Sequence, residues 1–192
     1  MAEKKQDKEA IKSIEVFERQ TNRMKNLVDQ LLQMTAIDRK GTTFSIEDID
    51  VRDVIESACD DIAYIDTKHI TFEYSLQPTI IQANMNLIYI VINNLLSNAV
   101  KYSNEGAKIY VSCGEKDGKS YIRIQDEGCG IEKENISKIF ESFYREKKDR
   151  NAEGFGLGLS QAMKIAELYG GGIYVESTKL SLIHISEPTR LL

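Results

Sequence analysis

One part of this sequence holds three short segments in a fixed order: NNLLSNAVKYS (residues 93–103), DEGCGI (residues 126–131) and GFGLGLS (residues 154–160). Each segment alone is weak evidence, because a spaced asparagine pair is usually solvated and a glycine-rich loop usually just leads into a helix. Their joint occurrence, with helix, strand and turn contexts that suit each one, is rarely a coincidence. The three segments together predict one binding site on an α/β domain.

The first segment belongs to an apolar helix that we expect over residues 85–102. Asn94 and Asn98 are four residues apart, so their amides share one face of that helix. Side-chain amide oxygens are ligands for hard cations. The pair therefore predicts a clamp for magnesium and phosphate.

The second and third segments offer complementary groups. Asp126 ends the alternating run YIRIQ, so it lies where a strand gives way to a glycine turn, and its carboxylate can accept a hydrogen bond from an adenine amine. Gly128 and Gly130 allow the backbone to approach a base closely. The three glycines of the last segment precede an apolar helix, whose free backbone amides can meet phosphate oxygens.

These segments resemble the N box and the two glycine boxes of the ATP-binding domain of sensor histidine kinases, within the superfamily that includes the gyrase, Hsp90 and MutL ATPases. A fourth segment, IFESFYR (residues 139–145), resembles the F box of the kinase branch. The resemblance covers residues 44–179, and it implies ATP and Mg²⁺ as cofactors, with Asn98 as the metal ligand and Asn94 assisting. Phe155 departs from it, because the family usually has a small or hydroxylated residue there. The nucleotide contacts implied are Asn94, Asn98, Lys101, Tyr102, Asp126, Gly128, Gly130, Ile131, Arg145, Gly154, Gly156, Leu157, Gly158 and Leu159.

The remaining pattern predicts an α/β fold, a two-layer sandwich in which one mixed sheet is covered by three helices on one face. A polar lid is expected between residues 143 and 154, where Arg145 is the best candidate for a phosphate contact among Arg145, Lys147, Lys148 and Arg150. The expected strands cover residues 44–49, 70–76, 107–113 and 120–126, and the expected helices cover residues 51–65, 85–102 and 159–169.

A long helix is expected before this domain, and it carries an apolar heptad seam. Residues 10–37 resemble the second helix of the kinase dimerisation domain, which implies a homodimeric four-helix bundle. The alternative is an amphipathic helix that folds onto the chain's own ATP-binding domain. Arg39, Lys40 and Gly41 end the helix, so we expect domains at residues 1–40 and 41–179. The seam consists of Ala10, Ile14, Phe17, Thr21, Met24, Val28 and Leu31.

Composition narrows the class of protein. The chain has 192 residues, 42% hydrophobic and 29% charged, and its net charge of −5 gives no reason to expect nucleic acid or an anionic membrane surface. No signal peptide or membrane segment is visible. Cys59, Cys113 and Cys129 lack zinc-site spacing, so free thiols in a reducing, cytoplasmic setting are expected, and whether an intact parent is anchored in the inner membrane stays open.

Both ends of the chain look clipped. Neither His69 nor His184 has the context of a phosphoacceptor, so we expect that histidine on a helix upstream of an internal Met1. Residues 180–190, LSLIHISEPTR, read as the translation of a sequencing adapter, so residues 180–192 are expected to be an artefactual tail and the sheet to lack its final strand. The apolar alternation of the tail leaves open that it imitates a strand.

The resemblance implies a fragment of a sensor histidine kinase. In the intact protein it would transfer the γ-phosphoryl group of ATP to a histidine, for relay to the receiver domain of a response regulator. One alternative is a hydrolytic ATPase of the gyrase, Hsp90 or MutL kind, which needs a glutamate on the N-box helix, and residues 85–102 contain no acidic residue. The other is a non-catalytic module for ATP binding and dimerisation.

Overall fold

The computed structural model describes residues 2–39, 43–146, 154–178 and 180–186. The chain divides into two compact units, Met1–Lys40 and Gly41–Leu192. The division falls between Lys40 and Gly41.

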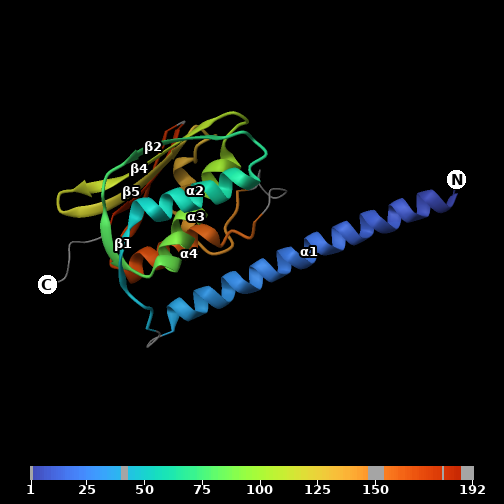
Figure 1. Ribbon diagram of the computed structural model, residues 1–192, viewed down its shortest axis with the longest axis horizontal. Helices are drawn as coiled ribbons and strands as arrows, with labels where there is room; N and C mark the ends of the chain where they lie inside the picture. The colour runs from blue at the N-terminus through green and yellow to red at the C-terminus, as the bar shows by residue number, and fades with distance from the viewer. Residues whose placement is uncertain (1, 40–42, 147–153, 179, 187–192) are drawn as a thin grey trace. The chain divides into compact units, whose positions relative to one another are not determined.

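The first unit is one long helix, α1 (Ala2–Asp38) (Figure 1). Its apolar seam faces solvent on the single chain, because Phe17 is 73% exposed and Met24 is 67% exposed. Ile14 and Val28 on the same seam are also exposed. No helix among the described residues is both long enough and apolar enough to cross a membrane.

The second unit is an α/β sandwich, as expected from the sequence. Its sheet has five strands in the order β2-β4-β5-β7-β6, with β2 and β4 parallel and the other neighbours antiparallel. The helices α2, α3 and α4 cover one face of this sheet, as Figure 1 shows. The strands are β2 (Thr71–Leu76), β4 (Lys108–Lys116), β5 (Lys119–Asp126), β6 (Gly172–Thr178) and β7 (Leu180–Ser186), and the helices are α2 (Val51–Ile65), α3 (Met85–Tyr102) and α4 (Gly158–Leu168).

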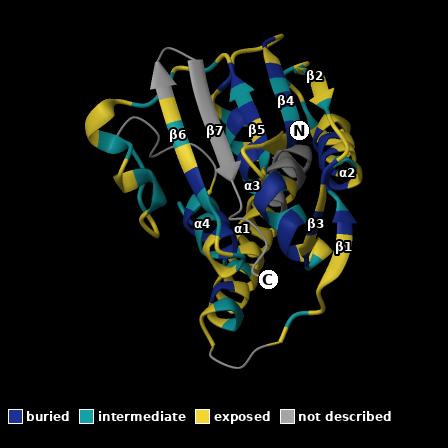
Figure 2. Ribbon diagram, turned by 90° about the vertical axis from the view of Figure 1, so that its left-hand side faces the viewer, coloured by how far each residue is buried: buried dark blue, intermediate teal, exposed yellow. Residues whose placement is uncertain are grey.

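Helix boundaries follow from local capping. Asp50 accepts a hydrogen bond from the backbone N of Arg52 at 3.1 Å and so caps α2. Asn84 caps α3 in the same way, accepting from the backbone N of Leu87 at 3.2 Å. The buried faces of the helices pack against Ile109, Val111 and Ile124 of the sheet, and buried residues gather between the two layers (Figure 2).

A small second sheet was not expected. β1 (Glu47–Asp50) pairs antiparallel with β3 (Ile80–Ala83), and β3 was absent from our sequence prediction. The strand is only four residues long, so its alternation is too brief to predict. Ile81 and Ala83 are nonetheless buried, and β3 leads directly into the cap of α3. Two short 3-10 helices, η1 (Lys133–Asn135) and η2 (Lys138–Phe140), follow the second segment of the site.

Residues 180–186 form the strand β7, the outcome that the apolar alternation of the tail left open. β7 lies between β5 and β6, and Ile183 is in register with Ile124 on one side and Val175 on the other. β5 and β6 both present ladder groups that need a partner, and the period-two pattern of residues 180–186 suits a strand. The origin of the tail in a sequencing adapter stays a prediction, but its backbone joins β5 to the edge strand β6.

Candidate nucleotide site

The site forms where the C-terminal half of α3 meets the glycine segments. Asn94 donates a hydrogen bond from Nδ2 to Oε1 of Gln161 on α4, at 3.3 Å. A methyl group at Gly158 would lie 2.9 Å from Oδ1 of Asn94. A side chain at the first residue of α4 would therefore displace the Asn94 amide, which packs directly against Gly158.

The expected adenine reader occupies the end of β5. Asp126 is only 4% exposed, and its Oδ1 accepts a hydrogen bond from the backbone N of Gly128 at 2.8 Å. A side chain at Gly128 would lie 2.6 Å from that Oδ1 and 2.8 Å from the carbonyl oxygen of Tyr102. The glycine turn therefore rests on the last turn of α3, and this contact joins the first two segments.

A positive charge lies between α3 and the third segment. The Nζ atom of Lys101 stands 5.0 Å from the ring centroid of Tyr102, within the range of a cation–π contact. A methyl group at Gly154 would lie 3.7 Å from the same Nζ. Lys101 thus lies beside the glycine loop, where an ammonium group can offset the charge of phosphates.

The aromatic segment holds the third segment in place. The backbone N of Phe143 donates to the carbonyl oxygen of Gly156 at 2.9 Å, and a methyl group at Gly156 would lie 2.5 Å from the carbonyl oxygen of Tyr144. Gly156 also has φ 76°, a left-handed conformation that favours glycine. Ser142 and Ser160 approach through their hydroxyl oxygens at 3.3 Å. The F box therefore sets the path of the chain into α4.

The remaining residues that were expected to contact the nucleotide lie around these three segments. Gly130 has φ 69° in the turn after Asp126, and Ile131 follows it half-buried. Leu157 is buried and Leu159 is half-buried at the start of α4. Only their backbone amides are therefore expected to contact a nucleotide. Arg145 is half-buried at the end of the F box. Lys147, Lys148 and Arg150 of the expected lid lie outside the described residues.

Gln161 and Ser160 are polar residues of this site that the sequence reasoning missed. Both are buried, Gln161 to 1% exposure, although they belong to a largely apolar helix. The only local sign of their role was that two adjacent polar residues lie within a largely apolar helix. Its meaning depends on the partner helix, which the local sequence does not reveal.

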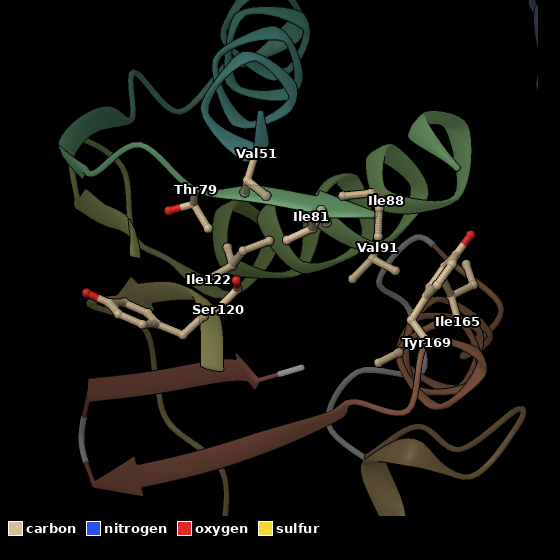
Figure 3. Close-up of a pocket in the computed structure, with 11 residues that line it drawn as sticks. Val51, Thr79, Ile81, Ile88, Val91, Ser120, Ile122, Ile165 and Tyr169 are labelled. Carbon is tan, nitrogen blue, oxygen red and sulfur yellow. The ribbon is translucent and has the colours of Figure 1, made fainter. Parts of the chain in front are cut away.

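A separate apolar cavity lies elsewhere in the core and contains none of the expected site residues. It is bordered by the helices and by β5, and Figure 3 shows Ile88, Val91 and Ile165 pointing toward it. Hydroxyl groups of Thr79 and Tyr169 stand at its margin. The cavity and the nucleotide site are thus built from different parts of α3 and α4.

The chain is similar to known proteins. Residues 83–189 match the family described as histidine kinase-, DNA gyrase B-, and HSP90-like ATPase. Sensor histidine kinase WalK of Bacillus subtilis is 33% identical over 168 residues, covering 84% of this chain and 28% of that protein. Sensor protein RprX of Bacteroides fragilis is 34% identical over 169 residues, covering 84% of this chain and 33% of that protein. This chain therefore spans about a third of the length of these relatives.

A solved structure supports the same similarity. The mycobacterial sensor histidine kinase MprB superposes with a TM-score of 0.69 at 26% identity, covering 77% of this chain and 100% of that one. The family match includes residues 180–186, so the region of β7 aligns with the family as well.

Proposed function

We propose that this chain, which belongs to the histidine kinase-, DNA gyrase B- and HSP90-like ATPases, is the ATP-binding catalytic part of a sensor histidine kinase. The observation that carries the proposal is the convergence of the two boxes on α3: Asn94 packs on Gly158, and the Asp126 turn packs on Tyr102. Relatives that match 84% of this chain are named sensor histidine kinase WalK and sensor protein RprX.

The kinase branch fits better than a hydrolytic ATPase for two reasons. The N-box helix α3, MNLIYIVINNLLSNAVKY, has no carboxylate that could activate water. The F box is joined to the second glycine box through Phe143 and Gly156. A site that positions phosphates without an acidic base of its own suits transfer to a nucleophile supplied from outside the domain.

Within this proposal, each residue has a physical task. Asp126 accepts the adenine amine, and Lys101 offsets phosphate charge beside Gly154. Backbone amides from Gly156 to Gly158 face phosphate oxygens at the start of α4. In the intact protein the γ-phosphoryl group passes to a histidine nitrogen and then to an aspartate of a response regulator.

The amides of α3 suit Mg²⁺ that is shared with phosphates. Asn94 and Asn98 are both half-buried on one helix face, and no group of three histidine, cysteine or acidic residues among the described residues could hold a metal by itself. Mg²⁺ bound with a nucleotide usually takes few protein ligands and keeps phosphate and water ligands. When bound, the ion supplies charge neutralisation at the phosphates.

The open seam of α1 supports assembly with a second copy of the chain. Phe17 and Met24 leave large apolar surfaces in water, and burial of each is worth about 1.5–3 kcal/mol. Seams with heptad spacing bury such residues against another helix. We therefore include homodimerisation through α1 in the proposed function.

Isothermal titration tests the nucleotide assignment. Mg-ATP should bind the wild-type chain, and Asp126→Asn should weaken binding, because an amide loses the charged acceptor for adenine while keeping the size of the side chain. Asp60→Asn, at an exposed position on α2, is the matched control and should bind like wild type. Equal binding by Asp126→Asn and wild type contradicts the role of Asp126, and no binding by wild type contradicts the proposed function.

A further inference from the structure

Lys68 holds the end of the N-box helix from outside the three sequence segments. Its ammonium Nζ donates to the carbonyl oxygens of Val100 at 2.9 Å, Lys101 at 2.7 Å and Ser103 at 2.8 Å. An ammonium group has three N–H donors, and these contacts use all three. The last carbonyls of a helix lack partners within it and carry the negative end of the helix dipole, so a lysine there satisfies both needs.

The backbone of Lys68 is itself fixed at both polar groups. Its N donates to Oδ1 of Asp66 at 2.9 Å, and its carbonyl oxygen accepts from the N of Gly106 at 2.7 Å. Oδ2 of Asp66 also accepts from the N of Ile70 at 2.6 Å. Hydrogen bonds therefore hold the loop between α2 and β2 at Lys68 and at Ile70, and they fix the backbone that carries the ammonium group.

The clamped turn is the one on which the Asp126 turn rests. The carbonyl of Tyr102 lies between those of Lys101 and Ser103, and it is the atom against which Gly128 packs. The N of Gly128 in turn donates to Oδ1 of Asp126. A continuous set of contacts thus runs from Lys68 through the end of α3 to the carboxylate assigned to adenine.

We propose that Lys68 is a positioning residue of the nucleotide site, which clamps the last turn of α3 so that Gly128 and Asp126 keep the geometry that receives the base. This inference rests on the proposed function. Lys68 acts through the backbone of α3, so its loss should change affinity for the adenine nucleotide more than it changes the stability of the fold.

The test compares Mg-ADP binding by isothermal titration in the full chain and three variants. Lys68→Met removes the three donors at similar length and should weaken binding about tenfold, equivalent to about 1.4 kcal/mol. Lys68→Arg keeps the charge and several donors and should recover at least half of that loss on a free-energy scale. If Lys68→Met does not fold, Lys68→Gln, with one donor group, takes its place and should also bind more weakly than wild type.

Two controls separate positioning from simpler effects. Tyr89→Phe, on the same helix α3, removes the hydrogen bond that the Tyr89 hydroxyl donates to Asp61 on α2, so it reports the effect of a lost tertiary bond away from the clamped turn. Lys119→Met removes one positive charge from the exposed start of β5. Both should bind Mg-ADP like wild type.

A spectroscopic measurement completes the test. The amide resonance of Gly128 should shift in Lys68→Met and return toward its wild-type position in Lys68→Arg, because that N–H reports the turn at Asp126. Wild-type affinity in Lys68→Met or Lys68→Gln, or loss of affinity shared by Lys119→Met, overturns the positioning role. Absence of Mg-ADP binding in the wild type overturns the proposed function instead.

Discussion

Gln161, buried on α4, accepts the Nδ2 hydrogen bond of Asn94 on α3 at 3.3 Å. The bond fixes which way the Asn94 carboxamide points, since its nitrogen is turned to Gln161 and its Oδ1 lies close to Gly158. Two helices are thereby joined at the point where phosphates are expected to lie. A residue outside the recognised boxes sets the orientation of one inside them.

Replacing Gln161 by leucine should therefore affect both stability and binding. A half-buried donor on Asn94 loses its partner, which costs about 1 kcal/mol of unfolding free energy, and the affinity for Mg-ADP should fall roughly tenfold. Thermal unfolding and isothermal titration measure the two effects. Gln82→Leu, at an exposed position on β3, is the control, and wild-type affinity in Gln161→Leu contradicts the orienting role.

Gly128 should tolerate no side chain, whereas Gly118 should tolerate one at a modest cost. A methyl group at Gly128 meets Asp126 and Tyr102 at under 3 Å, but at Gly118 it meets nothing within 4 Å. We expect Gly128→Ala to lose nucleotide binding and about 1–3 kcal/mol of stability through overpacking. Gly118→Ala, with φ 73°, should cost about 1 kcal/mol through backbone strain alone and leave binding intact. Retained binding in Gly128→Ala would mean that the turn is free to shift.

Phe17→Glu should reduce self-association through α1. A charge placed on the apolar seam would be buried without a partner in a helical bundle, and that is unfavourable by several kcal/mol. Light scattering coupled to size exclusion should show a dimer for the wild-type chain and a monomer for the variant. Glu18→Gln, at the next position, should leave the mass unchanged. A monomeric wild type at high protein concentration contradicts the proposed pairing.

Ionisation of the buried Cys59 thiol should lower the free energy of unfolding at high pH. Burial raises the pKa of its thiol from 9.0 to about 11. Because the folded-state pKa is the higher one, the contribution of the neutral thiol is full below about pH 9 and is lost as pH rises toward 11. Urea unfolding at pH 8 and pH 10 should show a smaller loss in Cys59→Ala than in wild type. Equal losses in both chains would contradict this cause.

Alkylation should distinguish the exposed cysteine from the two buried cysteines. Cys129 is exposed, while Cys59 and Cys113 are buried. Iodoacetamide at pH 8 should therefore modify Cys129 in the folded chain and all three cysteines in urea, as read by mass spectrometry. Rapid labelling of Cys59 under native conditions would show that its burial is not maintained in solution.

Removal of residues 180–192 should destabilise the second unit. The sequence alone predicted little change, but β7 pairs with β6 from Gly172 to Thr178 and with β5 from Tyr121 to Asp126. Deletion leaves both neighbours with open ladder groups and should cost at least about 2 kcal/mol, or roughly 4–8 °C in melting temperature. Deletion of residues 187–192 alone is the control and should change little. An unchanged melting temperature after the longer deletion contradicts the strand.

The sequence by itself determined the elements whose signals are local. The apolar run predicted α3 from residue 85 to 102, which matches the structure, and the alternation before Asp126 predicted β5. Glycines at Gly128, Gly156 and Gly158 could be assigned to a binding site because the motif residues lie close together along the chain. Such features depend on a few neighbouring residues, so no knowledge of the packing is needed to predict them.

Only the tertiary structure decided which residues support the site and which strand pairs with both β5 and β6. Lys68 and Gln161 reach their partners across more than thirty residues of chain, at Val100 and Asn94, and such contacts have no local pattern. β7 forms because β5 and β6 each have an edge whose backbone groups can pair with it. Hydrogen-bond partners and open edges are properties of the packed layers, and those exist only after distant segments have come together.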